Sequence, residues 1–433
     1  MNEDYDRFAN GCVATEEGDE VTTDHTLSGG LIHSSQFDHP LEQDGAIDTT
    51  ACSGIHSSSP YVVGTTISAV KHLPPAPFGL RYATEYPDVD DNWEGLSQTA
   101  LCTLRAPLGG NTVSDEKTKL TITAIIRTGV DQGAQLVVVN HTLVAKIYDP
   151  LYYEHINQYN YKEHVVVNAD GDYSCEAATY GWIQGSPAAK RLTPSFHGTW
   201  VADIETCVHG GDKECHIHLR KVPLILIELV NGHVMSEVNP SELPAETRSR
   251  VLKKAIEAEA VLFKAGVQHD DYHPRNIIIT NLHNLCASGS ADGPDVKVID
   301  FNVATVFRHP QSIRRNLRLV DQLYKTWHHK LLSPIRRWHG HLMDFSVAGW
   351  CSNEDGDAEQ WLWEQFHDDE KFIPVIWDPT TPNDIPRHMQ TPSELVHKRT
   401  DSVLRNDVSL EQEGCSDMTV NSTDHTQIAS VTY

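Results

Sequence analysis

Three side chains in one part of the chain have the chemistry to hold a metal ion and accept a proton. Asp271 and Asn276 share the short run 269–276 (His-Asp-Asp-Tyr-His-Pro-Arg-Asn), and Asp300 follows the apolar run 296–299. Phosphoryl transfer needs positioning and charge neutralisation more than covalent chemistry. One carboxylate, Asp271, could orient an attacking hydroxyl and take its proton. Asp300 and Asn276 supply the hard oxygen ligands that Mg²⁺ prefers. The alternative is a polar turn followed by an unrelated Asp-Phe pair.

The order of these motifs resembles that of a known superfamily. The pattern His-x-Asp-x-x-Pro-x-Asn, followed by an apolar strand that ends in Asp-Phe, resembles protein-kinase-like proteins, particularly the fungal and aminoglycoside-phosphotransferase-like branches. The resemblance implies an α+β, two-lobed fold with an antiparallel-sheet N-lobe, a mainly helical C-lobe and disordered termini. It also implies ATP and Mg²⁺ as cofactors and transfer of the γ-phosphoryl group to a hydroxyl acceptor, with a protein serine or threonine favoured. A pseudokinase or nucleotide-binding scaffold without turnover, and a small-molecule kinase, are the alternatives.

The N-lobe should begin with three antiparallel strands. Residues 120–126, 136–139 and 143–148 are apolar and rich in β-branched side chains, which favours strands. The turn between the first two contains Gly129 and Gly133. By the resemblance, this turn corresponds to the glycine loop that approaches the phosphates of the nucleotide.

Lys146 lies in the third of these strands, in the run Val-Ala-Lys-Ile. The resemblance assigns it to the α- and β-phosphates, whereas an exposed strand lysine is the alternative. A glutamate on the next helix should hold this lysine. Glu176 is the best candidate, and Glu154 and Glu163 are its rivals. The separation of Lys146 from Glu176 requires an insertion around 154–170.

The predicted hinge follows the apolar strand 223–227. By the resemblance, the backbone of Glu228 and Val230 would face the adenine edge. A helix of about 20 residues should then run from the polar start at 241–246 to Gly266, because apolar side chains recur on one face and glycine commonly ends a helix. Such a helix leads directly into the run that contains Asp271.

The chain departs from the pattern of the superfamily in several places. The glycine loop is degenerate, and Asp131 would bring a negative charge near a polyanion. Asn302 replaces the glycine of Asp-Phe-Gly, although asparagine tolerates unusual backbone angles. Asp270 replaces the arginine that normally pairs with a phosphate on the activation loop, so regulation by phosphorylation of that loop is not expected. The Ala-Pro-Glu motif that usually ends this segment is missing, so protein and small-molecule acceptors both stay open.

Composition and charge restrict the class of binding partner and the cellular compartment that we expect. The 433 residues carry a formal net charge of −26, which argues against nucleic acid or an anionic membrane surface as the main partner. Nine cysteines at irregular spacing do not suggest a disulfide framework, and no apolar run approaches the length of a membrane helix. The start of the chain lacks the pattern of a secretory signal. We therefore expect an intracellular protein, cytoplasmic or nuclear, and the sequence leaves its oligomeric state open.

The acidity and the sparse apolar residues at the N-terminal end indicate disorder there, and the polar C-terminal end indicates the same. The expected divisions are an acidic disordered arm (1–60), a linker or strap (61–115), the N-lobe (116–230), the C-lobe (231–378) and a disordered tail (379–433).

Overall fold

The computed structural model describes residues 59–79, 81–84, 92–104, 110–209, 215–282, 294–313, 318–352, 354 and 356–375. The predicted tail, and all of the predicted arm except its last two residues, lie outside these ranges. The chain divides into two units, Met1–Ile373 and Pro374–Tyr433. The elements below all belong to the first unit.

Six antiparallel strands close into a barrel in the order β1-β2-β3-β4-β6-β5. Alternate side chains of these strands, among them Leu120, Ile122, Val137 and Val139, form one buried apolar cluster inside it. This alternation is what a strand requires when one face is buried and the other is not. The strands are β1 (Thr66–Leu73), β2 (Asn111–Arg127), β3 (Gln135–Val139), β4 (Leu143–Ile147), β5 (Phe196–His209) and β6 (Cys215–Glu228).

The strands β2, β3 and β4 contain the three runs that the sequence predicts as strands, except that β4 ends one residue early, at Ile147. Strand β1 lies in the segment for which the sequence indicates a linker or a strap. It pairs with β2 and with β5 and so closes the barrel.

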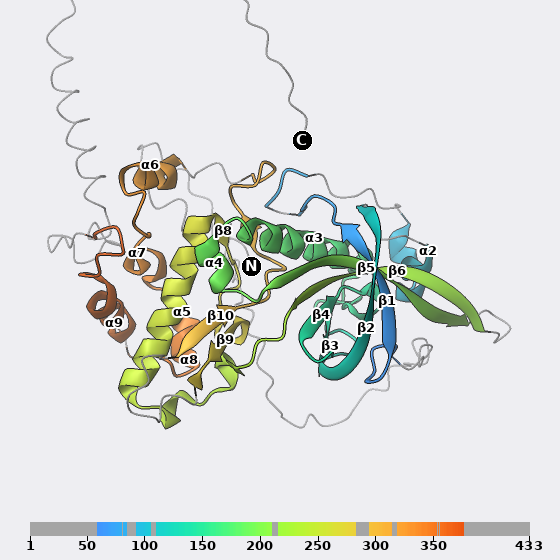
Figure 1. The fold of residues 1–433 in the computed structure, drawn as a ribbon, viewed down its shortest axis with the longest axis horizontal. Coiled ribbons are helices and arrows are strands. Elements are labelled where there is room, and N and C mark those ends of the chain that lie inside the picture. Colours follow the sequence, from blue (N-terminus) through green and yellow to red (C-terminus); the bar gives the residue numbers. More distant parts are fainter. Residues whose placement is uncertain are drawn as a thin grey trace, which may run out of the picture. The chain divides into compact units, whose positions relative to one another are not determined.

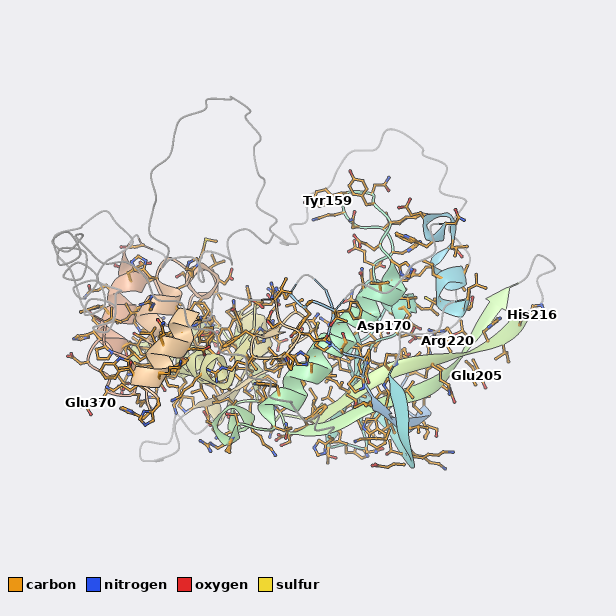
Figure 2. The ribbon with its side chains drawn as sticks, turned by 90° about the horizontal axis from the view of Figure 1, so that it is seen from above. Tyr159, Asp170, Glu205, His216, Arg220 and Glu370 are labelled. Carbon is orange, nitrogen blue, oxygen red and sulfur yellow. The ribbon has the colours of Figure 1, made fainter. Side chains whose placement is uncertain are left out.

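Strands β5 and β6 form a long ribbon, and Figure 2 shows His216 near its tip and Arg220 farther along it. Cys207 on this ribbon is disulfide-bonded, which the irregular spacing of the cysteines did not lead us to expect.

Helix α3 (Val165–Ile183) packs against β5 and β6, and Figure 1 shows it running alongside this pair of strands. Its first turn is capped by His164, whose Nδ1 accepts a hydrogen bond from the N–H of Val167 at 3.3 Å. The short helices α2 (Gln98–Leu104) and α4 (Pro187–Arg191) lie against α3. Helix α3 is therefore the element that carries Glu176 to the barrel.

The rest of the unit is built on helix α5 (Ala245–Ala265), which ends at Gly266 as the sequence predicts. Gly266 has a φ of +99°, a left-handed conformation that favours glycine. Two small antiparallel sheets follow, one of order β10-β9-β7 and one of order β11-β8. Their strands are β7 (His233–Val234), β8 (Val267–Gln268), β9 (Ile277–Thr280), β10 (Asp295–Val298) and β11 (Thr305–Val306).

Four further helices complete the described part: α6 (Arg318–Thr326), α7 (Pro334–Trp338), α8 (Met343–Val347) and α9 (Asp357–Phe366). The unit is thus a mixed α+β fold in which an antiparallel barrel is joined to a group of helices and short sheets. None of the helices in the described ranges combines the length and the apolar character needed to cross a membrane.

Candidate functional site

Lys146 on β4 joins two carboxylates that come from distant parts of the chain. Its Nζ lies 2.5 Å from Oε2 of Glu176 on α3 and 2.5 Å from Oδ1 of Asp300 after β10. The structure therefore brings the predicted partner Glu176 to Lys146. Of the rival glutamates, Glu163 instead accepts a hydrogen bond from Asn157 at 2.8 Å.

Burial and charge act in opposite directions on this cluster. Burial by itself would lower the pKa of Lys146, but the carboxylates of Asp300 and Glu176 together raise it above its usual value. Burial by itself would raise the pKa of Asp300, but the nearby basic groups, with Lys146 foremost, together hold that pKa below its usual value. For Glu176 burial is the larger effect, and its pKa is raised.

The two oxygens of Glu176 are not equivalent. Oε2 accepts hydrogen bonds from Lys146 and, at 2.7 Å, from the hydroxyl of Tyr148. Oε1 is buried and has no hydrogen-bond partner among the described residues. A buried oxygen without a partner is costly. Glu176 is therefore a carboxylate that holds the lysine in place and does not contact solvent.

The run that contains Asp271 forms a tight loop closed by its own side chains. Oδ2 of Asp271 accepts a hydrogen bond from Nδ2 of Asn276 at 2.8 Å, and Oδ1 accepts one from Arg275 at 2.5 Å. The loop ends in a short 3₁₀ turn, Pro274–Asn276, whose N–H of Arg275 donates to Nδ1 of His273 at 3.3 Å. The predicted pair Asp271 and Asn276 therefore lies in direct contact.

His269 connects this loop to the segment that carries Asp300. Its Nε2 lies 2.8 Å from the carbonyl oxygen of Ile299, and its ring packs on that of Phe301 with centroids 4.9 Å apart. Burial lowers the pKa of His269, which favours the neutral ring at pH 7, and a neutral ring that donates to this carbonyl carries its proton on Nε2. The N–H of Ile299 also donates to the carbonyl oxygen of Asn276 at 2.9 Å. Sequence reasoning gave His269 no such role, although it stands first in the motif.

The β2–β3 turn uses the amides of both predicted glycines within the protein. The N–H of Gly129 donates to Oε1 of Gln135 at 2.7 Å, and the N–H of Gly133 donates to the carbonyl oxygen of Tyr152 at 3.0 Å. Gln135 is fully buried and also donates to the carbonyl oxygens of both glycines. In this arrangement the two amides are not presented to a phosphate.

The predicted hinge begins at Glu228, which is the last residue of β6. The N–H of Glu228 donates to the carbonyl oxygen of Ser195 at 2.9 Å, and the N–H of Leu229 donates to that of Thr142 at 3.0 Å. The side chain of Glu228 accepts from the N–H of Ser195, which lowers the pKa of this carboxyl. Val230 takes part in neither backbone bond.

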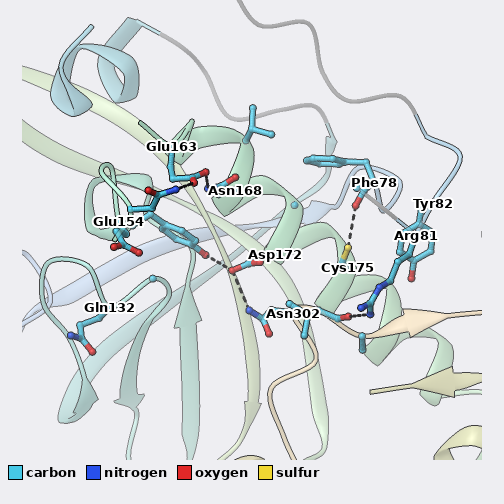
Figure 3. A pocket seen from close by; sticks show the side chains of 18 of the residues that line it. Phe78, Arg81, Tyr82, Gln132, Glu154, Glu163, Asn168, Asp172, Cys175 and Asn302 are labelled. Atoms are coloured by element: carbon cyan, nitrogen blue, oxygen red, sulfur yellow. Dashed lines mark hydrogen bonds between the residues drawn. The ribbon is translucent and has the colours of Figure 1, made fainter. Parts of the chain in front are cut away.

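A cavity of about 720 Å³ lies against α3, and Lys146, Glu176 and Asp300 are not among the described residues that line it. It is bordered by one face of α3, the β2–β3 turn, the segment after Tyr153 and residues 302–304. Figure 3 shows Asp172 inside it, where the carboxylate accepts hydrogen bonds from Tyr153 at 3.2 Å and from Asn302 at 3.3 Å. Burial raises the pKa of Asp172, while the nearby Lys146 opposes this effect. Asn302, which replaces the glycine of the superfamily's motif, thus faces α3.

Comparison with known proteins gives a distant structural likeness. No family model matches the chain, and no curated protein matches it. Among solved structures, the crystal structure of WbdD at 2.2 Å shares 14% identity with a TM-score of 0.30, over 57% of this chain and 51% of that chain. WbdD in complex with the kinase inhibitor LY294002 shares 16% identity with the same TM-score, over 57% of this chain and 50% of that chain. The chain spans about half the length of the WbdD chains that it matches.

Proposed function

We propose that this chain is an ATP- and Mg²⁺-dependent phosphotransferase of the protein-kinase-like class, which moves the γ-phosphoryl group to a hydroxyl acceptor. The observation that carries the proposal is the convergence of Lys146, Glu176 and Asp300. The two carboxylates lie 30 and 154 positions away from the lysine, yet both contact its ammonium at 2.5 Å. A polar turn followed by an unrelated Asp-Phe pair gives no reason for this contact.

The oxygen donors near the cluster fit a magnesium ion. Asp300 offers carboxylate oxygens, and its side chain is 28% exposed, so a bound ion can reach it. Asn276 uses its Nδ2 to hold Asp271, which leaves Oδ1 as the amide atom for a cation. These are hard oxygen ligands of the kind that Mg²⁺ takes beside substrate phosphates. A bound magnesium ion would neutralise the charge of the phosphates.

Nucleotide binding requires an exchange of partners at Lys146. Without nucleotide, the ammonium neutralises both Glu176 and Asp300. In the proposed complex Lys146 would pair with a phosphate of the nucleotide, and Asp300 would then be available to hold the cation. Glu176 keeps the lysine in position, because its Oε2 is also fixed by Tyr148. The exchange replaces one set of opposite charges by another and leaves no buried charge unpaired.

In the transfer step Asp271 orients the acceptor hydroxyl and takes its proton. Asn276 holds one oxygen of this carboxylate in place. The backbone of Glu228 and Val230 is assigned to the adenine edge. The favoured acceptor is a protein serine or threonine, and a small molecule is the alternative.

A specific observation favours a second candidate, a nucleotide-binding scaffold without turnover. The amides of Gly129 and Gly133 are already hydrogen-bonded within the protein, and both oxygens of Asp271 accept hydrogen bonds. Either function requires a nucleotide site. Turnover distinguishes them.

The binding step is tested by thermal unfolding with and without MgATP. A ligand at 100 times its dissociation constant stabilises the folded state by about 2.7 kcal/mol. We expect a magnesium-dependent stabilisation that disappears in Asp300→Asn and persists in Asp295→Asn, a matched change at the exposed start of β10. A wild-type protein that MgATP does not stabilise would refute the proposal.

Turnover is tested by phosphate release from MgATP, with water in place of the acceptor. Asp271→Asn should lower the rate by about 10²- to 10⁴-fold, the usual contribution of a general base, and leave the stabilisation by MgATP intact. Stabilisation by MgATP without any phosphate release, in the wild-type protein, would favour the scaffold.

A further inference from the structure

The segment before helix α2 lines the cavity and contacts α3, β11 and the loop of residues 269–276. Within the predicted linker or strap of residues 61–115, we use the name strap from here on for residues 78–84 alone, of which Leu80 lies outside the described residues. At one end the thiol of Cys175 on α3 donates to the carbonyl oxygen of Phe78 at 3.4 Å, as Figure 3 shows. At the other end the hydroxyl of Tyr82 accepts a hydrogen bond from the N–H of Val306 on β11 at 2.9 Å.

Backbone hydrogen bonds also attach the strap to the segment after β11. The N–H of Ile313 donates to the carbonyl oxygen of Arg81 at 3.1 Å, and the N–H of Ala83 donates to that of Gln311 at 2.6 Å. The strap is therefore held on both sides of Arg81, and the position of that side chain is restricted.

Arg81 forms an ion pair with Asp270, the residue immediately before Asp271. The Asp270 side chain is 0% exposed. Asp270 also accepts a hydrogen bond from the hydroxyl of Thr305 at 2.7 Å, and the Arg81 guanidinium donates to the carbonyl oxygen of Val303 at 2.8 Å. Arg81 thus joins the loop of residues 269–276 to the segment that follows Asp300.

The backbone of Asp270 is in a conformation that needs outside support. Its φ is +62°, in the left-handed region, which is uncommon for a residue other than glycine. A buried carboxylate is also costly unless an opposite charge pairs with it. Since Arg81 supplies that charge, it stabilises the conformation of Asp270. The direction in which the next residue, Asp271, leaves the chain depends on that conformation.

We propose that Arg81 is a positioning residue, which fixes the loop that carries Asp271 through its ion pair with Asp270. The kinetic part of this inference rests on the proposed phosphotransferase function. In the superfamily's motif the loop supplies an arginine, which pairs with a phosphate on the segment that follows the metal-binding aspartate. Here the loop supplies the negative charge of Asp270, and the strap supplies the positive charge of Arg81. Because Arg81 is part of the chain, the loop is held without a phosphate on the segment that follows Asp300.

The test is a double-mutant cycle with Arg81→Gln, Asp270→Asn and the double variant. Asparagine tolerates the left-handed backbone and removes only the charge. Arg308→Gln is the matched control, because Arg308 forms an exposed ion pair with Asp321. We expect Arg81→Gln to lower kcat for phosphate release from MgATP by about 10- to 100-fold, since a displacement of about 1 Å can cost 10²-fold. KM for MgATP should change less than about twofold.

The double variant lacks the Asp270 carboxylate that Arg81 neutralises. The kcat of the double variant should therefore exceed the kcat of Arg81→Gln alone. A general loss of structure would instead impair nucleotide binding together with kcat. An unchanged kcat in Arg81→Gln, or equal losses in kcat and in the stabilisation by MgATP, would overturn the inference.

Hydrogen exchange separates this inference from the proposed function, because it needs no nucleotide. The amides of residues 269–276 should exchange faster in Arg81→Gln than in the wild-type protein or in Arg308→Gln, and the barrel strands should be unaffected. Unchanged exchange in this loop would overturn the role of Arg81 whatever MgATP does. A wild-type protein that neither binds MgATP nor releases phosphate, but shows the faster exchange in the variant, would refute only the phosphotransferase.

Discussion

Arg220 and Lys221 are neighbours on β6, and Arg220 makes a buried ion pair whereas Lys221 makes an exposed one. Replacing each by methionine removes the same charge, so the difference in stability between the two variants measures the effect of burial. The guanidinium of Arg220 donates to both oxygens of Asp149, at 2.6 and 2.9 Å, and to the hydroxyl of Thr206. Asp149 is fully buried and also accepts a hydrogen bond from Tyr61 at 2.7 Å. The change Arg220→Met leaves that buried carboxylate without its cation.

The expected magnitudes follow from exposure. Removing one partner of a buried ion pair costs about 3–5 kcal/mol, because the other charge stays desolvated. The side chains of Lys221 and its partner Asp203 are 60% and 43% exposed, and an exposed pair contributes about 0–1 kcal/mol. We therefore expect Arg220→Met to lower the free energy of unfolding by about 3 kcal/mol more than Lys221→Met.

Urea unfolding of the wild-type protein and both variants measures this difference, as a change in midpoint at constant slope. The double variant Arg220→Met/Asp149→Leu is a second check. It replaces the whole pair by apolar side chains, and such replacements are often nearly neutral, so it should be more stable than Arg220→Met alone. If Arg220→Met cost no more than Lys221→Met, the burial argument would be refuted.

Local patterns in the sequence predict the elements that depend on local chemistry. Runs of apolar, β-branched side chains locate β2 and β3, and the glycine after a periodic apolar face locates the end of α5 at Gly266. The approach of Glu176 to Lys146 also follows from local features, because Glu176 is the only glutamate on α3, the helix placed after the third strand.

Contacts between distant segments are less accessible from the sequence. Strand β1 has few inward apolar side chains, Ile67 and Ala69 among them, and its place is decided by pairing with β2 and β5. The ion pair of Arg81 with Asp270 joins segments far apart in the chain, so neither residue indicates its partner. Gln135 is a local exception, because its hydrogen bonds to the neighbouring turn depend on a side-chain conformation that residue types do not determine.

Two further predictions concern the site itself. Gln135→Leu removes three hydrogen bonds to the β2–β3 turn and should lower the free energy of unfolding by about 1–3 kcal/mol, measured by urea unfolding; no loss would contradict the geometry of the turn. Lys146→Met should destabilise the protein more at pH 7 than at pH 4.5. In the wild-type protein the lysine keeps the pKa of Asp300 below its usual value. The ionised Asp300 therefore stabilises the fold at any pH above the usual pKa, and this stabilisation is lost only as the pH falls through the lowered pKa. Without the ammonium, burial dominates at both Asp300 and Glu176, and their pKa values rise above the usual ones. A carboxyl with a raised pKa disfavours the fold once it ionises, so the variant regains stability on acidification, and its deficit of about 3–5 kcal/mol at pH 7 should shrink toward pH 4.5. Lys221→Met, measured in parallel, corrects for the general effect of acid. A deficit for Lys146→Met that stayed constant or grew at the lower pH would show that Lys146 does not neutralise the two carboxylates.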